Sequence, residues 1–146
     1  MTKNIISRIL TLSVVVAILF LSACKGDDGA TLSKQDEVKA KLTGSPWKVS
    51  TVMVDGVDKT SIYNALGLIF TNTGFTATNG GVIWPASGTW TFTSTDATAI
   101  TRNDGLVITL TDVTATSLKL GLNWTKNTLG GRTESVSGQH VFTFGK

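Results

Sequence analysis

The sequence has little of the residue types that crosslink a small domain or hold a metal ion. Its 146 residues include one cysteine, one histidine and two prolines. A single cysteine forms no disulfide within the chain, and it leaves too few cysteine and histidine ligands for a structural zinc site. We therefore expect the packing of an apolar core to supply the stability of the domain.

Motifs that carry catalysis are missing as well. His140, the only histidine, is expected near the last strand with its tip facing solvent. Asp55 and Asp58 lie close together, but the alternating carboxylates of a calcium-binding loop are absent. The segment 135–138 lacks the Gly-x-Ser-x-Gly elbow of a hydrolase. We predict a protein that is not an enzyme and that uses no cofactor or metal.

The long apolar run of the chain lies at the N-terminus. Lys3 and Arg8 precede an apolar stretch from about Ile9 to Phe20, and small residues follow it. This order is typical of a secretory signal. The run is too short, and too interrupted by polar residues, to stay in a bilayer as a permanent helix.

The residues after this run, Leu21-Ser22-Ala23-Cys24, resemble the lipobox of bacterial lipoproteins. The resemblance implies transfer of diacylglycerol to Cys24, cleavage after Ala23, and acylation of the new amino terminus, for example with palmitate. Residues 1–23 would then be a signal peptide and 24–32 a flexible tether, with the protein attached to a membrane at Cys24. The alternative is an ordinary signal peptide followed by a stray buried cysteine.

The tether suggests a location. Lys25-Gly26-Asp27-Asp28 resembles the export signal that some Gram-negative phyla place after the lipidated cysteine, with Gly26 interrupting the pattern. In enteric bacteria an Asp at position 25 would favour the inner membrane, so Lys25 favours the outer membrane. The periplasmic face and the cell surface both stay open.

The charge balance excludes one class of partner. The chain has 13 basic and 10 acidic side chains; two of the basic ones, Lys3 and Arg8, belong to the signal, which leaves 11 against 10. A net charge near +1 gives no electrostatic basis for binding nucleic acid. The 123 residues that remain after position 23 are enough for one domain.

One helix and a series of strands are expected. Ser33 is a suitable N-cap for a helix over 33–43 that closes one end of the domain, and Gly44 stops it. From Trp47 onward apolar and polar residues alternate with the period of a strand. Residues 58–66 fit one helical turn or a loop. The expected strands are 47–53, 68–71, 75–78, 88–93, 99–101, 106–110, 118–124 and 140–144.

Short connections between these strands favour pairing in chain order. We therefore predict an all-β domain over 33–146, an eight-stranded up-and-down barrel, with Trp90 facing inward and Thr91 facing outward. A two-sheet sandwich of the immunoglobulin type is the alternative, although only 126–137 is long enough for its crossover connection.

Three short motifs, Leu42–Lys48, Gly88-Thr89-Trp90 and Val141–Phe144, are similar to those of lipocalin-like domains in small bacterial lipoproteins. The resemblance covers about 42–144 and implies the same barrel. Lipocalins place one residue between the first glycine and the tryptophan, where this chain has two. Arg132 is the nearest candidate in sequence for the arginine that packs over that tryptophan in lipocalins.

The interior positions are crowded with aromatic and aliphatic residues, so we expect a filled barrel that serves as a scaffold or interaction protein. A binding module for a small apolar ligand is the alternative. Recognition is expected at the loops 82–86 and 123–137, with Trp84, Lys126 and Arg132 as candidate ligand-binding residues. Trp84 is also suited to plug the mouth of the barrel. The sequence leaves the oligomeric state open.

Overall fold

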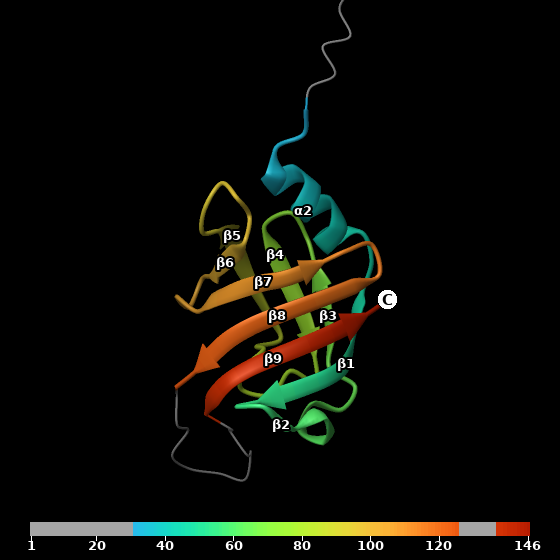
Figure 1. The fold of residues 1–146 in the computed structure, drawn as a ribbon, viewed down its shortest axis with the longest axis vertical. Coiled ribbons are helices and arrows are strands. Elements are labelled where there is room, and N and C mark those ends of the chain that lie inside the picture. The colour runs from blue at the N-terminus through green and yellow to red at the C-terminus, as the bar shows by residue number, and fades with distance from the viewer. Residues whose placement is uncertain (1–30, 126–136) are drawn as a thin grey trace, which may run out of the picture. The chain divides into compact units, whose positions relative to one another are not determined.

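The fold is one antiparallel sheet that closes on itself, with a short helix at one end (Figure 1). The computed structural model describes residues 31–125 and 137–146. The helices are α2 (Lys34–Thr43) and the 3₁₀ helix η1 (Thr60–Tyr63). The strands are β1 (Trp47–Val54), β2 (Val57–Asp58), β3 (Gly67–Phe70), β4 (Gly74–Thr78), β5 (Ser87–Phe92), β6 (Ala99–Arg102), β7 (Val107–Val113), β8 (Ser117–Trp124) and β9 (Gly138–Gly145).

The strand order confirms the eight-stranded barrel and rules out the sandwich. The sheet runs β2-β1-β3-β4-β5-β6-β7-β8-β9, and pairing of β1 with β9 closes it. The ninth strand, β2, is an addition of two residues that pairs with the end of β1 across the turn at Asp55-Gly56. Both turn residues have positive φ, as a tight hairpin turn requires.

The wall of the barrel is uneven in its pairing. β9 runs along most of β8, from Ser117↔Gly145 to Trp124↔Gly138. By contrast, β1 and β3 share two residue pairs, Trp47↔Leu68 and Lys48↔Gly67. Beyond Lys48, the segment that contains η1 lies against β1, and the Val49 N–H donates to the Leu66 carbonyl at 2.9 Å. The seam between β1 and β3 therefore has the fewest paired residues of the barrel wall.

Helix α2 caps one end of the barrel, as the sequence predicts (Figure 1). Ser33 is the N-cap, and its hydroxyl accepts a hydrogen bond from the Asp36 backbone N–H at 3.1 Å. Val38 and Leu42, four residues apart, are the buried residues of the helix. Trp47 at the start of β1 donates its indole N–H to the Leu42 carbonyl at 2.9 Å, which ties the helix to the wall. No helix in the described part of the chain is long and apolar enough to cross a membrane.

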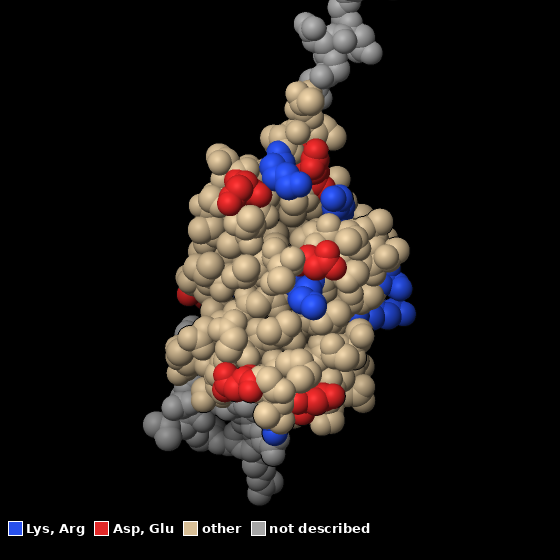
Figure 2. All heavy atoms as spheres, viewed as in Figure 1, with Lys and Arg blue, Asp and Glu red and all other residues tan. Residues whose placement is uncertain are grey.

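Alternation along the strands separates core from surface, and on the face drawn in Figure 2 charged side chains of both signs are scattered among uncharged ones. Trp90 is 3% exposed while Thr91 is exposed, so the predicted facing of β5 is confirmed. The threonines of β5 on the Thr91 side face solvent, as expected for good strand formers on a wet face. The segment 58–66, expected to be one helical turn or a loop, contains the 3₁₀ helix η1, whose Tyr63 lies in the core. Large side chains that are almost fully buried include Trp47, Trp84, Phe142, Phe144, Leu42, Leu66, Leu68 and Ile83.

Candidate functional site

The loop between β4 and β5 folds into the barrel. Trp84 on this loop is 1% exposed. Its ring meets Phe75 edge to face, with centroids 5.8 Å apart, and meets Phe142 in the same way at 5.9 Å. Trp84, a predicted ligand-binding residue, therefore lies in the interior, as in the plug interpretation, and presents almost no surface to a ligand in this conformation.

The geometry of the loop requires this inward turn. Asn79 and Gly81 have positive φ, and the Trp84 N–H donates to the Gly80 carbonyl at 3.0 Å. A Cβ at Gly80 would lie 2.2 Å from the Trp84 carbonyl oxygen. Since real contacts are never this close, only glycine fits at position 80, and this glycine permits the tight turn that directs Trp84 inward.

A buried arginine fastens the loop. Arg102, at the end of β6, is 3% exposed, and its guanidinium lies over the rings of Trp84 and Phe75 at 5.5 and 5.6 Å from their centroids. It donates to the Ile83 carbonyl at 2.6 Å and forms a two-pronged ion pair with Asp104, with Nε–Oδ1 at 3.1 Å. Such a fork holds its partners in a fixed geometry.

Sequence reasoning missed Arg102, although one signal was available. Ile100 faces inward and is fully buried, and side chains two residues apart on a strand share a face. Alternation along β6 therefore places Arg102 inward. A buried arginine needs partners, and the acid two residues later was the obvious one to examine.

The second buried polar group is His140, which the sequence analysis wrongly placed with its tip in solvent. His140 is fully buried, because it lies on the inward face of β9 with Phe142 and stacks against that ring at 5.6 Å. Its Nδ1 donates to the Gly138 carbonyl at 3.0 Å, so Nε2 accepts from the Tyr63 hydroxyl at 2.9 Å. Burial lowers the pKa of His140, and burial raises the pKa of Tyr63 to about 12.

These buried groups do not form a metal centre. No cluster of three or more histidine, cysteine or acidic side chains occurs within 31–125 and 137–146. The pair of Tyr63 and His140 is neutral at pH 7 and is closed to solvent. Its clear role is structural, because it links η1 to β9 across the interior.

The remaining predicted site residues are placed as follows. Cys24, Lys126 and Arg132 lie outside the described residues, as does most of the loop 123–137. The cation that the structure shows over Trp47 is Lys146, whose Nζ lies 4.5 Å from the ring centroid.

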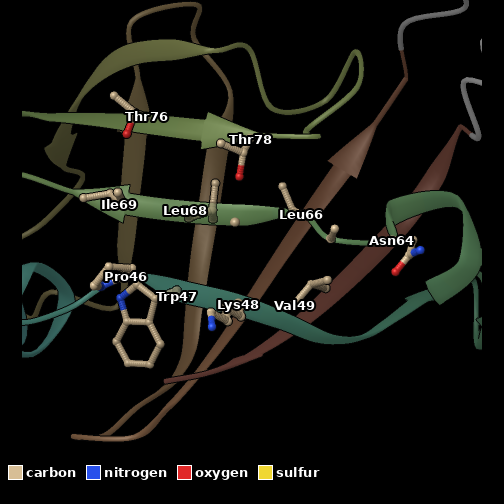
Figure 3. Close-up of a pocket in the computed structure, with 12 residues that line it drawn as sticks. Pro46, Trp47, Lys48, Val49, Asn64, Leu66, Leu68, Ile69, Thr76 and Thr78 are labelled. Carbon is tan, nitrogen blue, oxygen red and sulfur yellow. The ribbon is translucent and has the colours of Figure 1, made fainter.

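A groove that sequence reasoning did not find lies on the outer wall, along the seam between β1 and β3 (Figure 3). It has a volume of about 480 Å³, larger than two other hollows of about 310 and 140 Å³. Ile69 of β3 lies on its floor, Lys48 of β1 lies along one side, and Thr76 and Thr78 of β4 lie along the other. Gly67 of β3 also lines the groove, between its pairing partners Lys48 and Thr78.

The register explains why the wall is hollow here. Lys48, Gly67 and Thr78 are paired across three neighbouring strands, so they form one row on the outer face. The middle residue of that row has no side chain, which leaves open the space between its neighbours. Ile69 beside it remains 48% exposed.

Fold and interior together define a closed antiparallel β-barrel domain with a packed aromatic interior and a groove on its outer wall. No protein-family model matches the chain, and no curated protein matches it either.

Proposed function

We propose that this protein is a lipid-anchored component of the cell envelope whose barrel acts as a scaffold or interaction domain. The observation that carries the proposal is the packed interior. Trp84 and Phe142, each at most 1% exposed, meet at the centre of a continuous set of aromatic contacts where a carrier would hold its ligand. An eight-stranded barrel has room for its own side chains or for one small ligand, and here the side chains take the room.

The anchor rests on the sequence. The signal peptide 1–23, the lipobox ending in Cys24 and the tether 24–32 support attachment to the outer membrane, at the periplasmic face or at the cell surface. Together with the barrel, they resemble the small lipocalin-like lipoproteins of bacteria. Three acyl chains hold a protein on a membrane far more firmly than the marginal binding of one chain.

The competing function is that of a binding module, with a small apolar ligand inside the barrel. That function requires Trp84 to leave the interior when the ligand enters. The fork of Arg102 and the tight turn at Gly80 oppose this movement. A barrel filled by its own side chains and a barrel that binds a ligand therefore differ in the effect that removing Trp84 should have on ligand binding.

Indole provides the test, with the full chain as the material. A Trp84→Ala substitution should lower stability by about 3–5 kcal/mol and leave a space the size of an indole ring. Indole should then raise the thermal midpoint of Trp84→Ala while leaving the wild type unchanged, because a ligand stabilises only the state that binds it. Trp84→Phe, which leaves a smaller space, is the matched variant and should respond less.

Stabilisation of the wild type by indole or by palmitate, with the same midpoint shift in both variants, would contradict the proposal. The barrel would then bind apolar molecules without losing its plug, and the ligand-binding alternative would take its place.

A further inference from the structure

We infer that the groove on the outer wall binds a small amphipathic anion, with its carboxylate or phosphate head at Lys48 and its short apolar body over Gly67 and Ile69. This inference goes beyond the proposed function, because the groove lies on the opposite side of the wall from the packed interior. It also holds whether or not Cys24 carries lipid.

The shape and floor of the groove suit the apolar part of such a ligand. A volume of about 480 Å³ lies within the range of about 300–1,000 Å³ that small-molecule sites occupy. Ile69 is 48% exposed on the floor, while the outward residues beside it, Thr76 and Thr78 on β4 and Lys48 on β1, are polar. A ligand that covers Ile69 would remove this apolar surface from water.

The charges and polar groups suit the head. Among residues 31–125 and 137–146, Lys48 is the one charged residue that lines the groove, and no carboxylate lines it. In the described part of the chain, Lys48 has no ion-pair partner. The hydroxyls of Thr76 and Thr78 point toward the groove from β4, and neither has a hydrogen-bond partner among the described residues (Figure 3). One ammonium and two hydroxyl donors, with no acid opposite in the described part of the chain, favour an anion.

Gly67, the first residue of β3, keeps the groove open. A Cβ at position 67 would lie 2.8 Å from the Thr78 hydroxyl oxygen, so a side chain there would fill the space. No backbone lies that close to the position, and its φ suits any residue. A valine at position 67 should therefore close the groove without breaking the strand.

The isoleucine methyl groups provide the readout. In the full chain, labelled with ¹³C at the Ile δ1 methyl groups, the signal of Ile69 reports on the groove. Ile62, 36% exposed at η1, is an internal control outside it. The probes are hexanoate, hexyl phosphate and hexylammonium, which share one apolar body and differ in charge. Hexanoate and hexyl phosphate should shift the Ile69 signal in a saturable way, while hexylammonium and the Ile62 signal should show no saturable shift.

Two variants test the two halves of the site. Lys48→Gln removes the charge from an exposed position and should weaken hexanoate binding about tenfold, the equivalent of about 1.4 kcal/mol. Gly67→Val should abolish binding. Gly121→Val is the matched control, since Gly121 lies between the inward-facing Leu120 and Leu122 on another strand and has room for a Cβ. It should bind like the wild type.

A second arm identifies the source of the anion. The full chain is placed in nanodiscs of phosphatidylcholine, with and without phosphatidylglycerol. A shift of Ile69 caused by phosphatidylglycerol alone assigns the groove to a lipid headgroup, and a shift caused only by added hexanoate or hexyl phosphate assigns it to a free small molecule. Equal shifts with hexylammonium, unchanged binding in Lys48→Gln, or no saturable shift with any anion would overturn the inference.

Discussion

Removal of the Arg102 side chain is expected to be among the most damaging single changes in the barrel. The substitution Arg102→Ala deletes the fork to Asp104, the hydrogen bond to the Ile83 carbonyl and the contacts with two aromatic rings. Hydrogen bonds to charged groups contribute about 1.5–3 kcal/mol, and a cation over a ring about 0.5–2 kcal/mol. The side chain of Asp104 is 31% exposed and regains water where the guanidinium is removed, so the sum must be reduced. We expect a loss of about 3 kcal/mol.

The assay is urea unfolding of the full chain, followed by tryptophan fluorescence. A fall in the midpoint at constant slope measures the change in stability. Arg102→Lys keeps the charge but loses the fork, and it should lose about half as much. Arg102→Met keeps much of the length and apolar contact, and it should fall between the wild type and the alanine variant.

The reasoning fails if Arg102→Ala unfolds within about 0.5 kcal/mol of the wild type, the range of an ordinary surface substitution. It also fails if the lysine and alanine variants lose equal stability, because the fork geometry would then contribute nothing.

Two further predictions concern acid stability and the anchor. Burial lowers the pKa of His140 in the folded chain below its ordinary value of 6.5. As the pH falls, the unfolded chain therefore binds more protons at this residue than the folded chain does. The contribution of neutral His140 to the free energy of unfolding is complete above pH 6.5 and is lost as the pH falls below that value. The urea midpoint of the wild type should therefore decline in acid, and His140→Gln should flatten this decline. An equally steep decline in the variant would exclude His140 as its cause. Labelled palmitate should appear on the wild type but not on Cys24→Ala, and label on the variant would contradict lipidation at Cys24.

Much of the fold could be predicted from local pattern. Alternation of apolar and polar residues was enough to place the main strands, because side-chain direction alternates whatever the strand pairs with. Short connections were enough to order them. The same pattern correctly set Trp90 inside and Thr91 outside.

The errors occurred where a side chain depends on a neighbour that is distant in sequence. His140 was placed in solvent because histidine is commonly exposed, yet its partner Tyr63 comes from η1, 77 residues away. A polar residue is buried when a partner satisfies its hydrogen bonds, and no local sequence pattern predicts a partner that comes from another element. Alternation along β6 was enough to place Arg102 inside. It was missed for the same reason, because a charged residue is seldom placed inside a protein without a known partner.

The amino-acid sequence by itself determined the class of the domain, its capping helix, its strand order and most of its inward and outward faces, because these follow from propensities and periodicities within a few residues. Only the tertiary structure decided that Trp84 lies inside under Arg102, and that a groove opens over Gly67. Both depend on how strands far apart in the chain come into register. The Lys48, Gly67 and Thr78 row, for example, exists only after β1, β3 and β4 have paired.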